Sequence, residues 1–110
     1  MIVGSSSGSL TATTSSPVVA SGGRAGYAVQ LTGTFVGTVT FEASLDGGTT
    51  YVACGMTPIS DIRAGVIVST ATAAGIWVLP APGGAAISHL RARCSAYTSG
   101  TIVVTVTSGN

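Results

Sequence analysis

Residues 40–52 read TFEASLDGGTTYV, and this stretch decides the fold class. Before the turn, polar and apolar residues alternate. The polar residues are Thr40, Glu42 and Ser44, and the apolar residues are Val39, Phe41, Ala43 and Leu45. Alternation with a period of two is typical of a β-strand that buries one face. The glycines of the DGG segment accept the positive φ angles that a tight reversal requires. The stretch therefore predicts a β-hairpin with its return strand over residues 50–54, in an antiparallel β protein.

The rest of the chain repeats this pattern of short strands and turns. Residues 27–32 and 101–107 alternate cleanly, and we also expect strands at 18–19, 66–69 and 76–79. The run at 66–69 is continuously apolar and β-branched, which favours a strand buried on both faces. Residues 87–97 alternate strictly. Their pattern places Leu90, Ala92, Cys94 and Ala96 inward and Arg91, Arg93, Ser95 and Tyr97 outward.

These segments predict an all-β fold: an antiparallel two-sheet sandwich or jelly roll of seven to eight short strands. We expect no helix. Residues 1–16 are mostly serine, threonine and glycine, with isolated apolar residues at Ile2, Val3 and Leu10. A segment of this composition cannot build a core alone, so we predict an extended N-terminal arm over 1–16 and a β-sandwich domain over 17–110. The arm is either frayed or pairs with the sheet edge of another subunit.

The composition bears on what this domain does. Only 6% of the 110 residues are charged, against about 25% in ordinary globular domains, and the formal net charge is +1. A protein with few charges has little protection against association, and we therefore expect much of its surface to be covered in an assembly. The alternative is an uncharged soluble monomer. A nucleic-acid surface needs a basic stripe with stacking aromatic residues, and neither is present. No apolar run reaches the length of a membrane span, and no secretory signal is legible.

Metal and redox chemistry find little support in the sequence. Cys54 and Cys94 lie too far apart for a metal knuckle, and the single His89 cannot complete a structural zinc site. Both cysteines share strand parity with apolar neighbours, which favours buried free thiols, with a disulfide between facing strands as the alternative. We expect no cofactor.

Catalysis is not expected either. His89 is the one histidine that could act as a base, and its parity places it on the outward face beside Arg91 and Arg93. Glu42 lying opposite Arg91 or Arg93 would form a cross-strand ion pair rather than a reactive carboxylate. Trp77 and Tyr51 could form a platform on which a sugar ring stacks, but the position of Trp77 within an Ile-Trp-Val-Leu strand favours core packing.

Three segments together carry a resemblance: FEASLDGGTTYV at 41–52, GIWV at 75–78 and LRARCSAYTSGTIVVTV at 90–106. They resemble small β-sandwich proteins of tailed-bacteriophage virions, which serve as capsid decoration proteins, as tail or fibre modules, and inside carbohydrate-binding proteins. The similarity covers the chain from Val36 onward and leaves out residues 1–16.

This resemblance implies a capsid decoration (cement) protein that binds the major capsid protein and copies of itself, as trimers, on the capsid surface of the virion, after synthesis in the host bacterial cytoplasm. The residues expected at the partner interface are Ile2, Val3, Leu10, Arg91 and Arg93. The alternative is a tail- or fibre-associated module that binds host glycan through Tyr51, Trp77 and Tyr97, or a structural tail or neck component.

Overall fold

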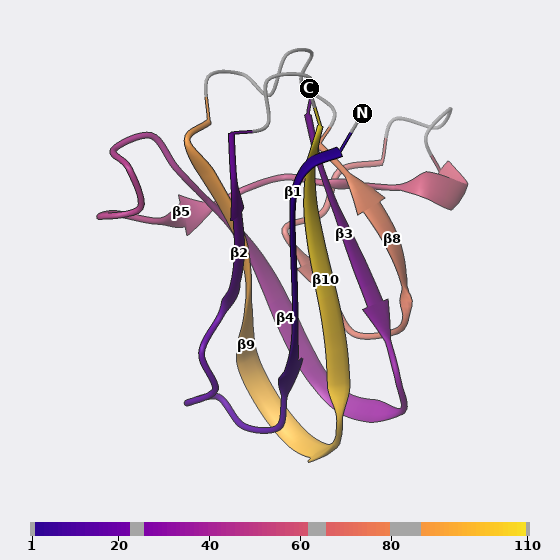
Figure 1. Ribbon diagram of the computed structural model, residues 1–110. Helices are drawn as coiled ribbons and strands as arrows, with labels where there is room; N and C mark the ends of the chain where they lie inside the picture. Colours follow the sequence, from indigo (N-terminus) through magenta and orange to yellow (C-terminus); the bar gives the residue numbers. More distant parts are fainter. Residues whose placement is uncertain (1, 23–25, 62–65, 80–86, 110) are drawn as a thin grey trace.

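The computed structural model describes residues 2–22, 26–61, 66–79 and 87–109, and these form two antiparallel sheets packed face to face (Figure 1). Sheet A has the order β1 (Ile2–Leu10), β10 (Ile102–Gly109), β3 (Gly26–Thr32), β8 (Gly75–Val78) and β6 (Thr57–Pro58). Sheet B has the order β2 (Val18–Ser21), β9 (His89–Gly100), β4 (Phe35–Ser44) and β5 (Val52–Ala53), with β7 (Thr70–Ala71) also paired to β4. A three-residue 3-10 turn, Ile59–Asp61, follows β6. The predicted β-sandwich is confirmed.

The core lies between the two sheets and is built from the inward positions of the alternating strands. Sheet A contributes Tyr27, Val29, Leu31, Trp77, Ile102, Val104 and Val106, and sheet B contributes Val39, Phe41, Leu90, Ala92 and Cys94. Phe41 and Trp77 meet across the sandwich with ring centroids 5.5 Å apart. The inward faces predicted for residues 27–32 and 101–107 are therefore confirmed.

Both cysteine thiols are free, so the disulfide considered from the sequence is wrong. Cys94 is buried in the core, and its Sγ donates to the Ala96 carbonyl at 3.3 Å. Cys54 is half-buried, and burial raises the pKa of its thiol.

Strand β1 corrects the expectation of a separate arm. It pairs antiparallel with β10 of the same chain, from Ile2 opposite Gly109 to Leu10 opposite Ile102, and forms one edge of sheet A. Leu10 is fully buried in the core and is not a partner anchor. A long ladder and one buried leucine hold the strand in place although its serines and glycines have low β propensity. The side chains of Ile2 and Val3 lie outside the described part of the structure.

The hairpin read from residues 40–52 has a longer loop than the sequence predicts. Strand β4 ends at Ser44, and β5 has only two residues, with Val52 opposite Ala43. Gly47 and Gly48 have φ angles of 76° and 91°, as expected for the reversal. Leu45, predicted to share the apolar face of Phe41 and Ala43, lies beyond the end of β4 and is 74% exposed.

The apolar run at 66–69 is not a strand, and this prediction is wrong. Val66 and Ile67 are 38% and 62% exposed, and Val68 forms a single bridge to Met56. The backbone joins sheet B only afterwards, where the Ser69 carbonyl accepts from the Phe41 N–H at 2.9 Å and β7 begins. β-Branched composition favours extended backbone, but it does not show whether a neighbouring strand is available.

A β-bulge in β9 reverses the predicted faces of its second half. Val39 pairs with Cys94 and Thr38 with Ala96, so Ser95 is an additional residue. After it Ala96 is exposed, while Tyr97 packs against the core and its hydroxyl donates to the Gly100 carbonyl at 2.7 Å. One inserted residue exchanges the two faces of a strand, and no local sequence signal marked it.

Candidate functional site

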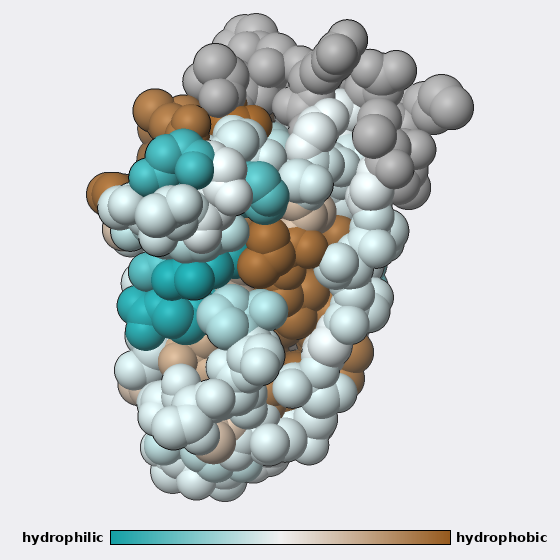
Figure 2. Space-filling view, turned by 60° about the vertical axis from the view of Figure 1, so that its left-hand side comes forward, coloured by the Kyte–Doolittle hydropathy of each residue, from teal (hydrophilic) through white to brown (hydrophobic). Residues whose placement is uncertain are grey.

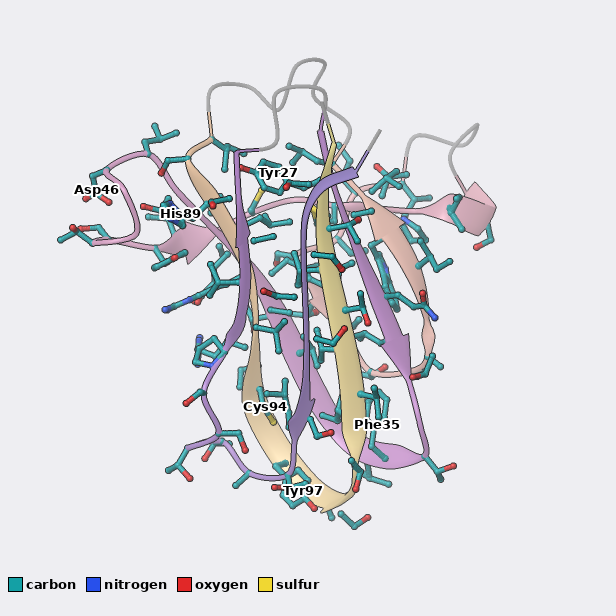
Figure 3. All side chains as sticks on the ribbon, viewed as in Figure 1. Tyr27, Phe35, Asp46, His89, Cys94 and Tyr97 are labelled. Carbon is teal, nitrogen blue, oxygen red and sulfur yellow. The ribbon has the colours of Figure 1, made fainter. Side chains whose placement is uncertain are left out.

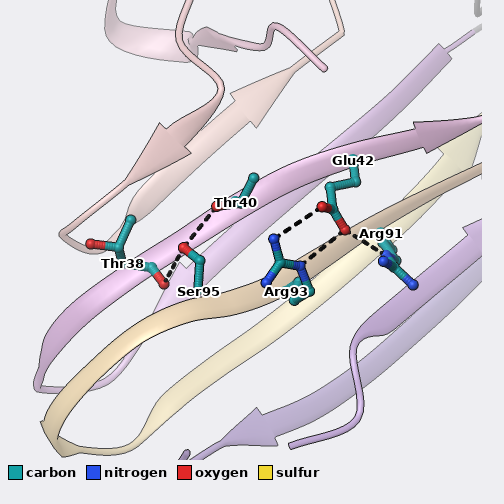
Figure 4. Close-up of polar contacts among 6 residues, drawn as sticks. All are labelled: Thr38, Thr40, Glu42, Arg91, Arg93 and Ser95. Atoms are coloured by element: carbon teal, nitrogen blue, oxygen red, sulfur yellow. Dashed lines mark hydrogen bonds and ion pairs between the residues drawn. The ribbon is translucent and has the colours of Figure 1, made fainter. Parts of the chain in front are cut away.

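A cluster of charged side chains lies on the outer face of sheet B (Figure 4). Arg91 Nε donates to Glu42 Oε1 at 2.7 Å, and Arg93 donates from Nε and Nη2 to the two carboxylate oxygens at 3.2 and 3.1 Å. Burial alone would raise the pKa of Glu42, but the hydrogen bonds and positive charges of Arg93 and Arg91 outweigh it and lower the pKa below its usual value. The predicted cross-strand ion pair is confirmed, and the Glu42 carboxylate binds both Arg91 and Arg93.

Neighbouring polar groups extend this cluster in both directions. The guanidinium of Arg91 lies over the ring of Tyr51, 3.8 Å from its centroid, in a cation–π contact. Farther along β4, Thr40 Oγ1 donates to Ser95 Oγ at 2.7 Å, and Ser95 Oγ donates to the Thr38 carbonyl at 3.3 Å (Figure 4). Arg91 and Arg93 therefore have a role within the chain, because their donors already bind Glu42.

Strong hydrophilicity is confined to a small part of this side of the molecule. On the face that Figure 2 turns forward, teal groups gather at the left, and most of the remaining described surface is pale or brown. Serine, threonine and glycine account for such a pale surface, which matches the low charge of the sequence.

The three aromatic residues proposed as a glycan platform do not come together. Trp77 is only 8% exposed and packs in the core. Tyr51 covers Arg91 near the start of β9, whereas Tyr97 lies near its other end (Figure 3). Arg91 and Tyr97 are six residues apart on one strand, a separation of about 20 Å at the rise of a β-strand. No flat aromatic surface of the expected kind forms from these residues.

The loop between β4 and β5 is fixed by the carboxylate of Asp46 (Figure 3). Its Oδ1 accepts from the Thr50 N–H at 2.9 Å, the Thr49 N–H at 3.1 Å and the Ser44 hydroxyl at 2.7 Å. The hydrogen bond from the Thr50 backbone and the one from Ser44 are the main reasons why the pKa of Asp46 falls to about 2. The carboxylate is therefore used to shape the loop.

The serine and histidine beside this loop do not form a nucleophilic arrangement. Ser88 Oγ donates to the Ser44 carbonyl at 2.9 Å and accepts from the Gly47 N–H at 3.1 Å. His89 Nδ1 lies 3.2 Å from that same hydroxyl. A triad needs a base that is itself oriented by a third group, and no described contact joins His89 to Asp46. These bonds fasten the loop to the start of β9.

An apolar depression opens next to the same loop. It has a volume of about 600 Å³ and is lined by Ala43, Leu45, Asp46, Thr50, Val52, Ala53, Cys54 and Gly55. Leu45 and Val52 are 74% and 67% exposed at its rim. The sequence did not predict this surface, because the alternation placed Leu45 on the same strand face as Phe41 and Ala43. One signal for this surface was present in the sequence: Leu45 directly precedes the turn, where the alternation of the strand no longer determines the direction of a side chain.

The outer face of sheet A carries a different surface, without formal charge in its described part. Its side chains stand in cross-strand rows: Ser9, Val103 and Thr32; Ser7, Thr105, Gln30 and Ile76; Ser5, Thr107, Ala28 and Val78. Ser7 Oγ and Thr105 Oγ1 are 3.0 Å apart across two of these strands. The face is a mixture of hydroxyl and aliphatic groups.

The described residues hold neither a cluster of metal ligands nor a membrane-spanning helix. No group of three histidine, cysteine, aspartate or glutamate side chains gathers there in a way that could hold a metal ion. No helix in that part of the chain is long and apolar enough to cross a membrane.

Comparison with known proteins gives one informative likeness. No family model matches the sequence, and no curated protein matches it. Among solved structures, the fold is similar to that of YomS, a protein derived from the SPBc2 prophage, with a TM-score of 0.65 and 17% sequence identity over 97% of this chain and 96% of YomS. At this identity the likeness shows a shared fold, over 97% of this chain.

Proposed function

We propose that this chain is a structural protein of a tailed-phage virion that decorates the capsid by docking on the major capsid protein, without catalytic chemistry. The observation that carries the proposal is the apolar depression rimmed by the exposed Leu45 and Val52. The prophage origin of the similar fold and the resemblance of the hairpin segments to virion proteins support the phage setting.

The depression suits a contact with a protein surface. Burying a leucine or valine side chain contributes about 1.5–3 kcal/mol, so Leu45 and Val52 could anchor a modest single contact. Exposed apolar groups around a depression are typical of interaction sites. A shell offers many identical sites, and self-association of the decorating copies would add strength through multivalency. A small subunit can therefore stay bound without a deep pocket.

The rival functions differ in what they require of the same residues. Glycan binding would need exposed aromatic faces, and Trp77 is in the core, so this alternative loses its central residue. A tail or neck component would use the same apolar surface on another partner. Capsid decoration and tail association therefore differ in which phage particle binds the protein.

The test replaces Leu45 and Val52 together by aspartate and measures co-sedimentation with purified phage heads and tails. We expect the wild-type protein to bind heads and the double variant to bind at least about tenfold more weakly, because charge would have to be desolvated in an apolar contact. Val36→Asp is the matched control, since Val36 is 58% exposed on β4 away from the depression. Undiminished head binding by the folded double variant, or binding to tails alone, would contradict the proposal.

A further inference from the structure

Strand β1 leaves one edge of sheet A unpaired within the described chain. The strand order ends at β1, whose other neighbour is β10. The nine residues of β1 include neither a charged residue nor a proline, the usual features that stop strands from adding to an edge. The register shifts only between Ile2 and Gly4 and is regular from there to Leu10. This edge is long, regular and unprotected.

The ladder determines which peptide groups of β1 face outward. The Tyr27 carbonyl accepts from the Leu79 N–H at 3.0 Å, so the peptide groups of Tyr27 point toward β8. Peptide groups alternate between the two sides of a strand, so Ser108, which pairs with Tyr27, bonds toward Gly4 in β1. The same alternation directs the peptide groups of Ser5, Ser7 and Ser9 away from β10. The N–H and C=O groups of these three residues face the edge, where no other described strand pairs with β1.

We propose that this edge pairs with β1 of a second copy of the chain, antiparallel and about a two-fold axis at Ser6. The sequence of residues 4–8 is GSSSG, which reads the same in both directions. Pairing about Ser6 sets Gly4 opposite Gly8 and Ser5 opposite Ser7. Both Ser5 and Ser7 carry outward peptide groups, so each copy meets the donors and acceptors that it lacks. The two A sheets then join into one.

An open groove lies beside part of this edge. A shallow groove of about 420 Å³ runs next to β1 and is lined by residues 6–9 on one side and 15–19 on the other. The glycines are already explained inside the chain: a Cβ at Gly8 would lie 3.0 Å from Val18 Cγ2, and one at Gly4 would lie 2.9 Å from Ser108 Oγ. Ser5, Ser7 and Ser9, whose peptide groups face the edge, have no comparable packing role. Their small side chains let a second backbone approach.

This pairing uses a different surface from capsid docking, because β1 and the Leu45–Val52 depression lie in different sheets. A two-fold contact uses the same surface on both copies and closes at two subunits. It therefore gives a dimer, whereas the resemblance to decoration proteins implied trimers. The mass of the free protein distinguishes the two, and head binding tests docking separately.

The experiment is sedimentation equilibrium of the full chain over about 1 µM to 1 mM, since a bare strand pairing is expected to be weak. Wild-type protein should form a dimer. Ser7→Pro removes an outward N–H and leaves the ladder to β10, so it should weaken dimerisation at least about tenfold while the fold is kept. Ser7→Ala should dimerise like the wild type. Because proline can strain a strand, Ser5→Lys with Ser7→Lys is the second variant, and Gln30→Lys on the same face is its control.

Each outcome decides the proposal. Loss of dimer in the proline or double-lysine variant, with unchanged circular dichroism and retained dimer in both controls, supports pairing through β1. A wild-type protein that is monomeric at the highest concentration overturns it. So does a trimer, or a dimer that persists in folded forms of both variants.

Discussion

At the scale of single residues, Asp46 shows how a side chain that resembles a catalytic acid is used for structure. Its Oδ1 binds two backbone N–H groups and the Ser44 hydroxyl, and the loop it organises holds Leu45 at the rim of the depression. The docking surface therefore depends on a carboxylate that need not touch a partner. We expect the ionisation of Asp46 to change the free energy of unfolding.

The prediction for Asp46 concerns acid pH. The pKa of the Asp46 carboxyl is about 2 in the folded chain, against an ordinary value of 3.8 for the unfolded chain. The folded state therefore favours the ionised form. A lowered pKa stabilises the fold fully above about pH 4, and this stabilisation is lost as the pH falls toward about 2. Asp46→Asn cannot titrate. Wild-type protein should therefore lose more of its unfolding free energy than Asp46→Asn over that range.

The measurement is thermal unfolding of both proteins at a series of acid pH values, with the Asp46 carboxyl titration followed by NMR. A titration midpoint close to 3.8 would show that the loop bonds do not stabilise the carboxylate. Equal losses of stability in the two proteins would lead to the same conclusion.

At the scale of secondary-structure elements, the sequence predicted well wherever alternation and pairing partner agreed. Residues 27–32 and 101–107 form β3 and β10 with the expected inward faces, and Glu42 meets Arg91 and Arg93 as expected. These predictions hold because period-two alternation directly reports which face is buried.

The failures have a common physical cause, which is that a strand needs a neighbour. Residues 66–69 have strand composition but no ladder, while the poor strand former at 2–10 has β10 beside it. The bulge at Ser95 depends on how β9 fits against β4, and the exposure of Leu45 depends on where β4 ends. Each is decided by tertiary pairing rather than by local pattern.

The prediction for the element concerns β1, which the sequence analysis placed in an arm outside the β-sandwich domain. Deleting residues 1–10 would expose the edge of β10 and leave a cavity at Leu10, so we expect a largely unfolded or aggregated product by circular dichroism. Leu10→Ala should lower the free energy of unfolding by about 2–5 kcal/mol. Ser9→Ala, at an exposed position of the same strand, should change it by less than about 0.5 kcal/mol.

A cooperative, soluble fold for the truncated chain would contradict this expectation and restore the idea of a separable arm. Chemical denaturation of Leu10→Ala and Ser9→Ala compares the two positions when the truncation cannot be purified. Equal stability of the two variants would show that β1 contributes little to the core.

At the scale of the whole molecule, charge is concentrated rather than merely scarce. Among the described side chains, Glu42 binds Arg91 and Arg93 on the outer face of sheet B, while the outer face of sheet A, the edge β1 and most of the rim of the depression are uncharged. The surfaces proposed for docking and for self-association are therefore the ones without ion pairs. Contacts of this kind depend on apolar burial and backbone pairing more than on electrostatic attraction.

The last prediction follows from this separation and concerns salt. Binding that relied on Arg91 or Arg93 would weaken steeply as the salt concentration rose from about 0.05 M to about 0.5 M, because screening shortens the reach of exposed charges. Docking through Leu45 and Val52 should change by less than about twofold over that range. Head occupancy measured by sedimentation at each salt concentration tests this. The matched variant is Arg93→Gln, which should bind heads like the wild type; a steep loss with salt, or a clear loss in that variant, would move the docking surface to the charged face of sheet B.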